Sequence, residues 1–304
     1  MPRRIELTLP AAKADRLVRH ALGRPGIAGI MRHPGASLAP PADTVVIDGT
    51  IEAVRSVLAH LAEEGLAPGE VMRLSEPLVL VAPAEKTPLE RETNEANWEE
   101  IGQLLRTDTQ PSVNFLLLMA LAGAIAAFGL VTDTLHVVVG GMLVAPGFEP
   151  ILRGVFGLLG HRHSFGAGLR ATLAGYAALA AGAAAALPLA LHLHGLSAAE
   201  LSGNTWVRYW SSIQGVGIAT ALLAGVAGGI LVSTRETVFA TGVMVALALV
   251  PTMALVGMGL VAGDWAIASG GLSRWASEVA CVALGGGPVL LLKRIAYHRR
   301  PTWD

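Results

Sequence analysis

Two regions with different hydrophobic patterns meet near residue 112. Before this point, apolar residues recur with short strand-like or helical periods, whereas from residue 113 long apolar runs are separated by brief polar segments. Periods of 2 and of 3.6 residues are typical of half-buried strands and amphipathic helices, and apolar runs of about 20 residues are typical of membrane-spanning helices. The pattern therefore predicts a soluble domain followed by a membrane domain.

The first region alternates between the two periods in a fixed order. Strands are predicted at 4–9, 27–32, 44–48 and 71–81, the last interrupted by Pro77, and helices at 11–22 and 51–65. The order strand-helix-strand-strand-helix-strand is the split βαβ motif. We therefore predict an α+β ferredoxin-like (βαββαβ) domain over residues 1–84. A fold does not establish a function, and two interpretations stay open, a dimerising or structural module and a ligand sensor.

An acidic segment, residues 85–112, follows this domain and is predicted to be a helical linker. It contains Trp98 and an apolar face of Ile101, Leu104 and Leu105. One interpretation is a solvated connector. In the other, Trp98 and the apolar face rest at the membrane surface, as amphipathic interfacial helices do.

Six apolar runs follow, each close to the length that a helix needs to cross the hydrocarbon layer. They lie at 113–131, 136–159, 169–191, 213–232, 238–261 and 275–292. We therefore predict an all-α polytopic membrane domain of six helices over residues 113–292, ending in a basic tail, 293–304. The third run is almost entirely Ala, Gly and Leu, so we expect it to pack closely against its neighbours.

Composition agrees with this division. The chain is 53% hydrophobic and 15% charged, whereas soluble domains are about 25% charged. Residues 1–112 hold 12 Lys/Arg and 16 Asp/Glu, and the remaining 192 residues hold only 10 and 7. The net charge of −1 gives no electrostatic footprint for nucleic acid.

The positive charges predict the orientation of the membrane domain. No apolar signal segment follows the two N-terminal arginines, so we expect the first domain to stay in the cytoplasm. On that basis only Arg208 and Arg274 fall in outside loops, and the inside segments hold the larger group of Arg153, Arg162, Arg170, Arg235, Lys293, Arg294, Arg299 and Arg300. This asymmetry predicts six spans with both termini in the cytoplasm.

A weak internal repeat connects the two halves of the membrane domain. A shift of 101 residues places Gly141 on Gly242, Ala145 on Ala246 and Pro150 on Pro251. Each half holds three spans, so the second copy would insert upside down, giving an inverted 3+3 repeat. Inverted repeats with broken helices in corresponding positions are typical of secondary transporters. The alternative is that Gly and Pro are simply frequent in membrane helices.

The proline-broken segments supply the candidate pathway. In GGMLVAPGFEP, residues 140–150, two prolines free backbone carbonyls that lipid cannot satisfy, and an acidic residue within a span marks a proton or cation site by default. The predicted pathway or ligand residues are Gly140, Gly141, Pro146, Gly147, Glu149, Pro150, Gly242, Pro251 and Thr252. The alternative for Glu149 is an ion pair with Arg153, four residues further along the helix.

Other polar residues give no chemical site. Asn114, Gln214 and Glu278 fall near predicted span starts, where capping or snorkelling explains them. The pairs His161/His163 and His192/His194 lack the carboxylates or cysteines of a metal site, and the single cysteine, Cys281, cannot build one. We therefore expect no metal and no cofactor. Without a nucleophile–base pair or a nucleotide-binding motif, we expect no enzyme.

The segments VVVGGMLVAPGFEPI (137–151) and VALALVP (245–251) resemble the bacterial and archaeal membrane family named domain of unknown function 389, over about residues 3–292. The matching positions are Gly140, Met142, Leu143, Ala145, Pro146, Pro150 and Pro251. This chain departs from the family pattern at Gly147-Phe148-Glu149, at Thr252 and in an asparagine missing from the last span. The resemblance implies a topology and a bacterial or archaeal cytoplasmic membrane, and it implies no role for Glu149.

These observations favour a transporter or channel for a small solute or ion, with a pathway lined by the broken helices. The alternative is a membrane-anchored sensor or scaffold whose cytoplasmic domain binds a ligand or partner. The lipid bilayer is the predicted environment. Small-residue helix faces and exposed strand edges favour a homo-oligomer.

Overall fold

A computed structural model of the chain describes residues 3–65, 70–75, 98–160, 162–234 and 240–297. They form two compact units that divide between Asn97 and Trp98. The predicted strand residues 76–81, the linker residues 85–97 and the tail 298–304 lie outside the described residues. The first unit holds a small antiparallel sheet, and the second is helical.

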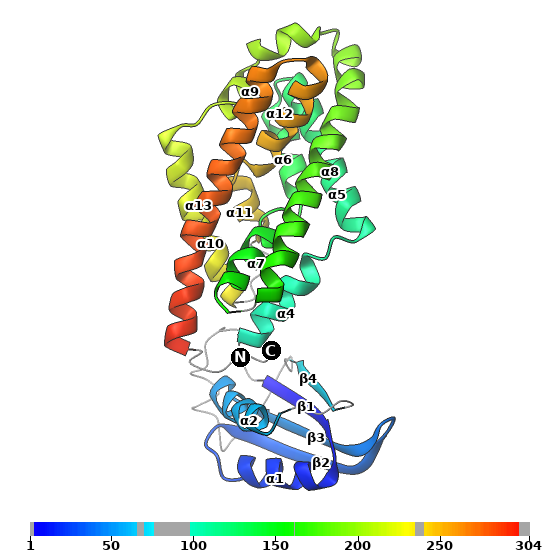
Figure 1. Ribbon diagram of the computed structural model, residues 1–304, viewed down its shortest axis with the longest axis vertical. Helices are drawn as coiled ribbons and strands as arrows, with labels where there is room; N and C mark the ends of the chain where they lie inside the picture. Colours follow the sequence, from blue (N-terminus) through cyan, green and yellow to red (C-terminus); the bar gives the residue numbers. More distant parts are fainter. Residues whose placement is uncertain (1–2, 66–69, 76–97, 161, 235–239, 298–304) are drawn as a thin grey trace. The chain divides into compact units, whose positions relative to one another are not determined.

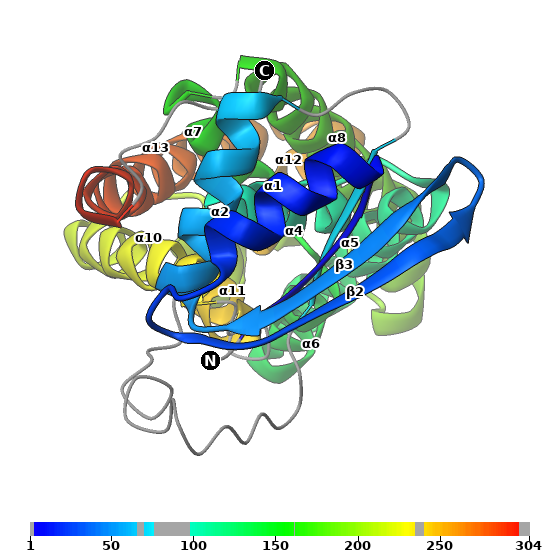
Figure 2. The same cartoon turned by 90° about the horizontal axis from the view of Figure 1, so that it is seen from below.

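The described residues of the first unit form two helices and four strands in the order expected from its sequence. The elements are β1 (Arg3–Leu9), α1 (Ala11–Ala21), β2 (Ile27–Leu38), β3 (Pro41–Gly49), α2 (Ile51–Glu64) and β4 (Val71–Ser75). The strand order is β2-β3-β1-β4, and all neighbours are antiparallel. β2 and β3 run side by side as a long hairpin (Figure 2), so both strands are longer than their periodicity predicts.

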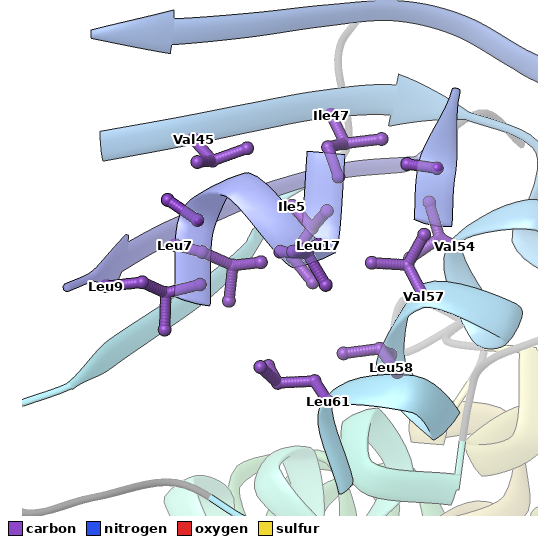
Figure 3. Packing of buried hydrophobic residues seen from close by; sticks show 12 residues of the cluster. Ile5, Leu7, Leu9, Leu17, Val45, Ile47, Val54, Val57, Leu58 and Leu61 are labelled. Carbon is purple, nitrogen blue, oxygen red and sulfur yellow. The ribbon is translucent and has the colours of Figure 1, made fainter. Parts of the chain in front are cut away.

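Alternation along β1 creates the core of this unit. Ile5, Leu7 and Leu9 are fully buried, whereas the residues between them are only half-buried. Figure 3 shows these side chains directed toward residues of α1 and α2, among them Leu17 and Leu61. Burial of apolar surface on one face of the sheet is the main term that stabilises such a unit. The Thr50 hydroxyl accepts the Ala53 N–H and caps α2.

The second unit contains long helices whose axes run in similar directions, with shorter helices between them (Figure 1). Its elements are α4 (Trp98–Asp108), α5 (Val113–Val131), α6 (Leu135–Val144), α7 (Glu149–Leu158), α8 (Arg162–His194), η2 (Ala198–Gly203), α9 (Thr205–Trp210), α10 (Gly215–Thr234), α11 (Ala240–Ala246), α12 (Leu249–Ala262) and α13 (Trp265–Tyr297).

Several of these helices are long and apolar enough to cross a membrane. Among the described residues, four single helices have the length and hydropathy of a membrane span, namely α5, α8, α10 and α13. α6 and α7 reach the length and hydropathy of a span only when they are taken together, and the pair is bent by 48° at the break between them. α12 is a shorter apolar helix of 14 residues. The protein is therefore a membrane protein.

Two helices begin earlier than the apolar runs predict. α8 starts at Arg162 and α13 at Trp265, seven and ten residues before the expected positions. Hydropathy alone excludes these first turns because they contain polar and charged residues. As a result, Arg274 lies inside α13 and not in an outside loop, which corrects the sequence-based assignment.

The amphipathic helix α4 belongs to the second unit. Trp98, Ile101 and Leu105 are buried, and the Trp98 ring packs on Phe156 of α7 with 4.4 Å between ring centroids. Residues 98–108 are therefore part of the helical unit and not a solvated connector.

Candidate functional site

Two helix breaks dominate the interior of the second unit. One lies between Val144 and Glu149, and the other between Ala246 and Leu249. Pro150 and Pro251 then fall in the first turns of α7 and α12. A proline there removes no helical hydrogen bond, and its fixed φ favours a helix start. The prolines therefore mark where the second helix of each pair begins.

The first break is held by a side-chain hydrogen bond from α8 to the backbone of the break. The Tyr176 hydroxyl donates to the Gly147 carbonyl over 3.1 Å, and both residues are buried. A Cβ atom at position 147 would lie 2.7 Å from the Tyr176 Oη and 2.9 Å from the Met244 Cε. A side chain at position 147 would therefore displace the ends of the Tyr176 and Met244 side chains, so α8 and α11 both approach the first break closely, and this break lies against the helix that precedes the second break.

The second break is capped by a carboxylate from α13. The Ala248 N–H, at the N-terminus of α12, donates to Glu278 Oε2 over 2.5 Å. Arg274 Nε donates to Glu278 Oε1 over 2.9 Å, and both residues are only 2% exposed. A negative charge at a helix N-terminus is favourable because it meets the positive end of the helix dipole. Glu278 thus satisfies the backbone N–H of the N-cap residue, as the acidic residue of a capping box does from within its own helix.

Arg274 ties this cap to the start of α10. Its Nη1 donates to the Ser212 carbonyl over 2.8 Å. A Cβ atom at Gly217 would lie 2.1 Å from Nη2, so the guanidinium lies directly on the α10 backbone. One buried cation therefore joins α13, the segment before α10 and α10 itself.

Tyr176 connects the two breaks. Its ring makes an edge contact with Trp275 of α13, with 5.1 Å between ring centroids. The charges of both Glu149 and Glu278 act on the Tyr176 hydroxyl. We call Glu149, Tyr176, Arg274 and Glu278 the break cluster. It places two carboxylates, one cation and one phenol among apolar helices, where polar groups are costly unless they are satisfied.

Glu149 and Arg153 do not form the ion pair that their spacing suggested. Glu149 is the first residue of α7, with a buried Oε2 atom. Arg153 Nη1 donates to the Thr109 hydroxyl over 2.9 Å and to its carbonyl over 3.4 Å. No ion pair joins Glu149 to Arg153 in the described residues. Arg153 turns toward the end of α4, where free carbonyls favour a cation.

The remaining predicted pathway residues divide into two groups. Pro146 lies in the first break beside Gly147, and Pro150 and Pro251 are buried at the helix starts. Thr252 is fully buried, but its hydroxyl donates to the Ala248 carbonyl of its own helix over 2.6 Å. Three glycines lie away from the break cluster. A Cβ atom added at Gly140 or Gly242 would meet no other part of the protein within 4 Å, and Gly141 packs on α5, where a Cβ atom would lie 2.9 Å from the Ala122 carbonyl.

The sequence-based reasoning missed three of the four residues of the break cluster. Glu278 was expected near a span start, Arg274 in a loop, and Tyr176 within an apolar run. The available signal was the i,i+4 spacing of Arg274 and Glu278, which favours a pair on one helix. It becomes visible only when α13 is extended upstream to Trp265. No group of three or more His, Cys, Asp or Glu that could hold a metal ion occurs within the described segments.

Comparison with known proteins supports the resemblance noted in the sequence. Residues 142–284 match the model of the family described as domain of unknown function (DUF389). The match runs from Met142 in α6 to Leu284 in α13, so it contains both breaks and the whole break cluster. The first unit and Gly140 lie outside it. No curated protein and no solved structure matches the chain.

Proposed function

We propose that this chain, whose residues 142–284 match the DUF389 family model, is a transporter or channel for a small solute or ion and that its pathway passes the break cluster. The observation that carries the proposal is the buried Glu278 carboxylate on the N-terminus of α12. Ionisable residues inside membrane helices are expensive and mark ion or proton pathways. Broken helices whose ends meet charged groups are the binding sites of many secondary transporters.

The contacts of Glu278 suggest how the site works. Its two carboxylate oxygens take one N–H from Arg274 and one from Ala248, so the anion is stabilised while the site is at rest. A proton or cation that binds Glu278 competes with these donors and releases the start of α12. Because Arg274 also binds the Ser212 carbonyl, the same event changes the connection to α10. Occupancy of one carboxylate is thereby coupled to helices on both sides of the second break.

The finer architecture is part of the proposal. We infer six spans, in which α6–α7 and α11–α12 each count as one broken span, arranged as an inverted 3+3 repeat. The support is that Pro150 and Pro251, 101 residues apart, both fall in the first turn after a break. We also assign the first unit to the ferredoxin-like class from its element and strand order. Both termini are assigned to the cytoplasm, from the distribution of positive charge.

A proton-flux assay tests the function. The full chain is reconstituted into liposomes that contain a pH-sensitive dye, and a potassium diffusion potential drives protons inward. We expect the protein to acidify the vesicles faster than empty liposomes. Glu278→Gln should slow this flux at least tenfold, because the amide keeps the size of the side chain but cannot take up and release a proton. Glu149→Gln should reduce it by a smaller factor.

Glu200→Gln is the matched control, since Glu200 is an exposed carboxylate in the capping box of η2 and should leave flux unchanged. The same vesicles are then tested for sodium and potassium uptake. If neither protons nor these cations cross faster than in empty liposomes, the transport proposal fails. A ligand bound by the first unit would then favour the sensor interpretation.

A further inference from the structure

Arg153 is a buried cation that lies outside the break cluster. It is 8% exposed, and its Nη1 hydrogen bonds are to Thr109, a neutral residue. Its Nε atom is buried and has no hydrogen-bond acceptor in the described residues. Arg153 therefore has free donor capacity, and no carboxylate pairs with it in the described part of the chain.

Two further arginines surround it. Arg106 near the end of α4 and Arg170 on α8 are both exposed, and their charges act on Arg153. The hydrogen bonds to Thr109 place Arg153 at the end of α4, which carries Arg106. α8, which carries Arg170, packs closely on α7 here, since a Cβ atom at Gly168 would lie 2.5 Å from the Gly154 backbone N. Like charges repel, and a buried charge without a counter-charge is strongly unfavourable. An anion bound among these arginines would offset the repulsion and pair with the buried guanidinium.

The surface beside these arginines is apolar. Leu169 and Leu173 are exposed on α8, and Val113 and Leu117 are exposed on α5, which begins four residues after Thr109. Both helices are long and apolar enough to span a membrane. A ligand bound to the arginines therefore has a hydrocarbon-compatible surface next to its anionic group.

We propose that Arg106, Arg153 and Arg170 bind the phosphate of an anionic phospholipid. Arginine suits phosphate because its planar donors form paired, charge-assisted hydrogen bonds, and basic pockets between membrane helices recognise anionic headgroups. The phosphate supplies acceptors for the guanidinium groups, and the acyl chains cover the exposed leucines of α8. A free phosphate ion has the same headgroup chemistry but gains nothing from the apolar surface.

The test uses the purified full chain in detergent. Bound lipids are counted by native mass spectrometry, and the melting temperature is followed as phosphatidylglycerol, phosphatidylcholine or inorganic phosphate is added. We expect phosphatidylglycerol to bind and to raise the melting temperature, and phosphatidylcholine to bind at least fivefold more weakly. Inorganic phosphate should have less than a tenth of the effect of phosphatidylglycerol at equal concentration.

Arg153→Gln should weaken phosphatidylglycerol binding at least tenfold. If this variant fails to fold, the exposed Arg170→Gln should still weaken binding several-fold, whereas Arg208→Gln, an exposed arginine of α9, should not. Equal binding by wild type and Arg170→Gln would overturn the proposal. Equal stabilisation by inorganic phosphate would overturn the assignment to a lipid.

Discussion

Close backbone contacts at glycines join α8 to two other helices. A Cβ atom at Gly182 would lie 1.9 Å from the Ala120 carbonyl oxygen of α5, and one at Gly257 would lie 2.0 Å from the Ala180 carbonyl oxygen of α8. Helices of membrane proteins associate by this kind of packing because burial from lipid gives no hydrophobic driving force. The expected close packing of the Ala- and Gly-rich third run is thereby confirmed.

A single methyl group at one of these contacts tests their contribution. Gly182→Ala forces the α5 and α8 backbones apart, and we expect it to lower the free energy of unfolding by about 1–3 kcal/mol, in the usual range for overpacking. Gly140→Ala is the control, because a Cβ atom there meets nothing within 4 Å. Thermal unfolding in one detergent compares the two. A Gly182→Ala variant as stable as Gly140→Ala would show that the helices adjust without cost.

At the scale of elements, apolar runs predicted the uninterrupted helices well. The run at 113–131 coincides with α5, because this helix carries no charge between its ends. The apolar run did not predict the start of α13, because Arg274 and Glu278 form an ion pair inside this helix. Every charged residue lowers the average hydropathy of a segment, whereas two paired charges can be buried within a membrane helix. The break cluster was hidden for the same reason.

The breaks themselves could be predicted from Gly and Pro, but their partners could not. The position of Gly147 in a break follows from its flanking prolines, Pro146 and Pro150. That the Tyr176 hydroxyl donates to the Gly147 carbonyl depends on how α8 packs, which no local pattern encodes. Likewise, the i,i+4 spacing indicated an ion pair between Glu149 and Arg153, but Arg153 binds Thr109 at the end of α4 instead.

In the first unit, two histidines join α1 to α2 and make this contact sensitive to pH. The rings of His20 and His60 stack with 4.0 Å between centroids. Burial, followed by the charges of His60 and Arg24, lowers the pKa of His20 below its usual 6.5. As the pH falls below 6.5, the unfolded chain takes up this proton more readily than the folded one, so the first unit loses stability.

Hydrogen exchange measures this loss in the full chain. Between pH 7.5 and 5.5, protection of α1 and α2, corrected for the intrinsic exchange rate, should fall about two- to tenfold. His60→Gln removes one neighbouring charge, so it should raise the pKa of His20 and reduce the pH dependence. His33→Gln, at an exposed site on β2, is the control. A pH dependence unchanged by His60→Gln would mean that the ring stack does not set it.

At the scale of the whole molecule, the two breaks decide how many times the chain crosses the membrane. If α6–α7 and α11–α12 each cross once, the segment of η2 and α9 and the turn before α13 lie on the same side of the membrane, opposite both termini. If α11–α12 instead enters and returns, the start of α13 changes side. If α6–α7 returns, η2 changes side. Each arrangement therefore gives a different pattern of exposed sites.

Single cysteines distinguish these arrangements. Cys281 is the only cysteine and is buried, so Cys281→Ala gives a background without thiols. Arg19→Cys on α1, Ser202→Cys in η2 and Trp265→Cys at the start of α13 place one thiol each at an exposed position. A membrane-impermeant maleimide should label Arg19→Cys only in inside-out vesicles and the other two only in right-side-out vesicles. Labelling of Trp265→Cys together with Arg19→Cys, with Ser202→Cys still labelled from the opposite side, would make α11–α12 a re-entrant loop. Labelling of all three from the same side would make α6–α7 the re-entrant loop, and in either case the inverted repeat would have to be abandoned.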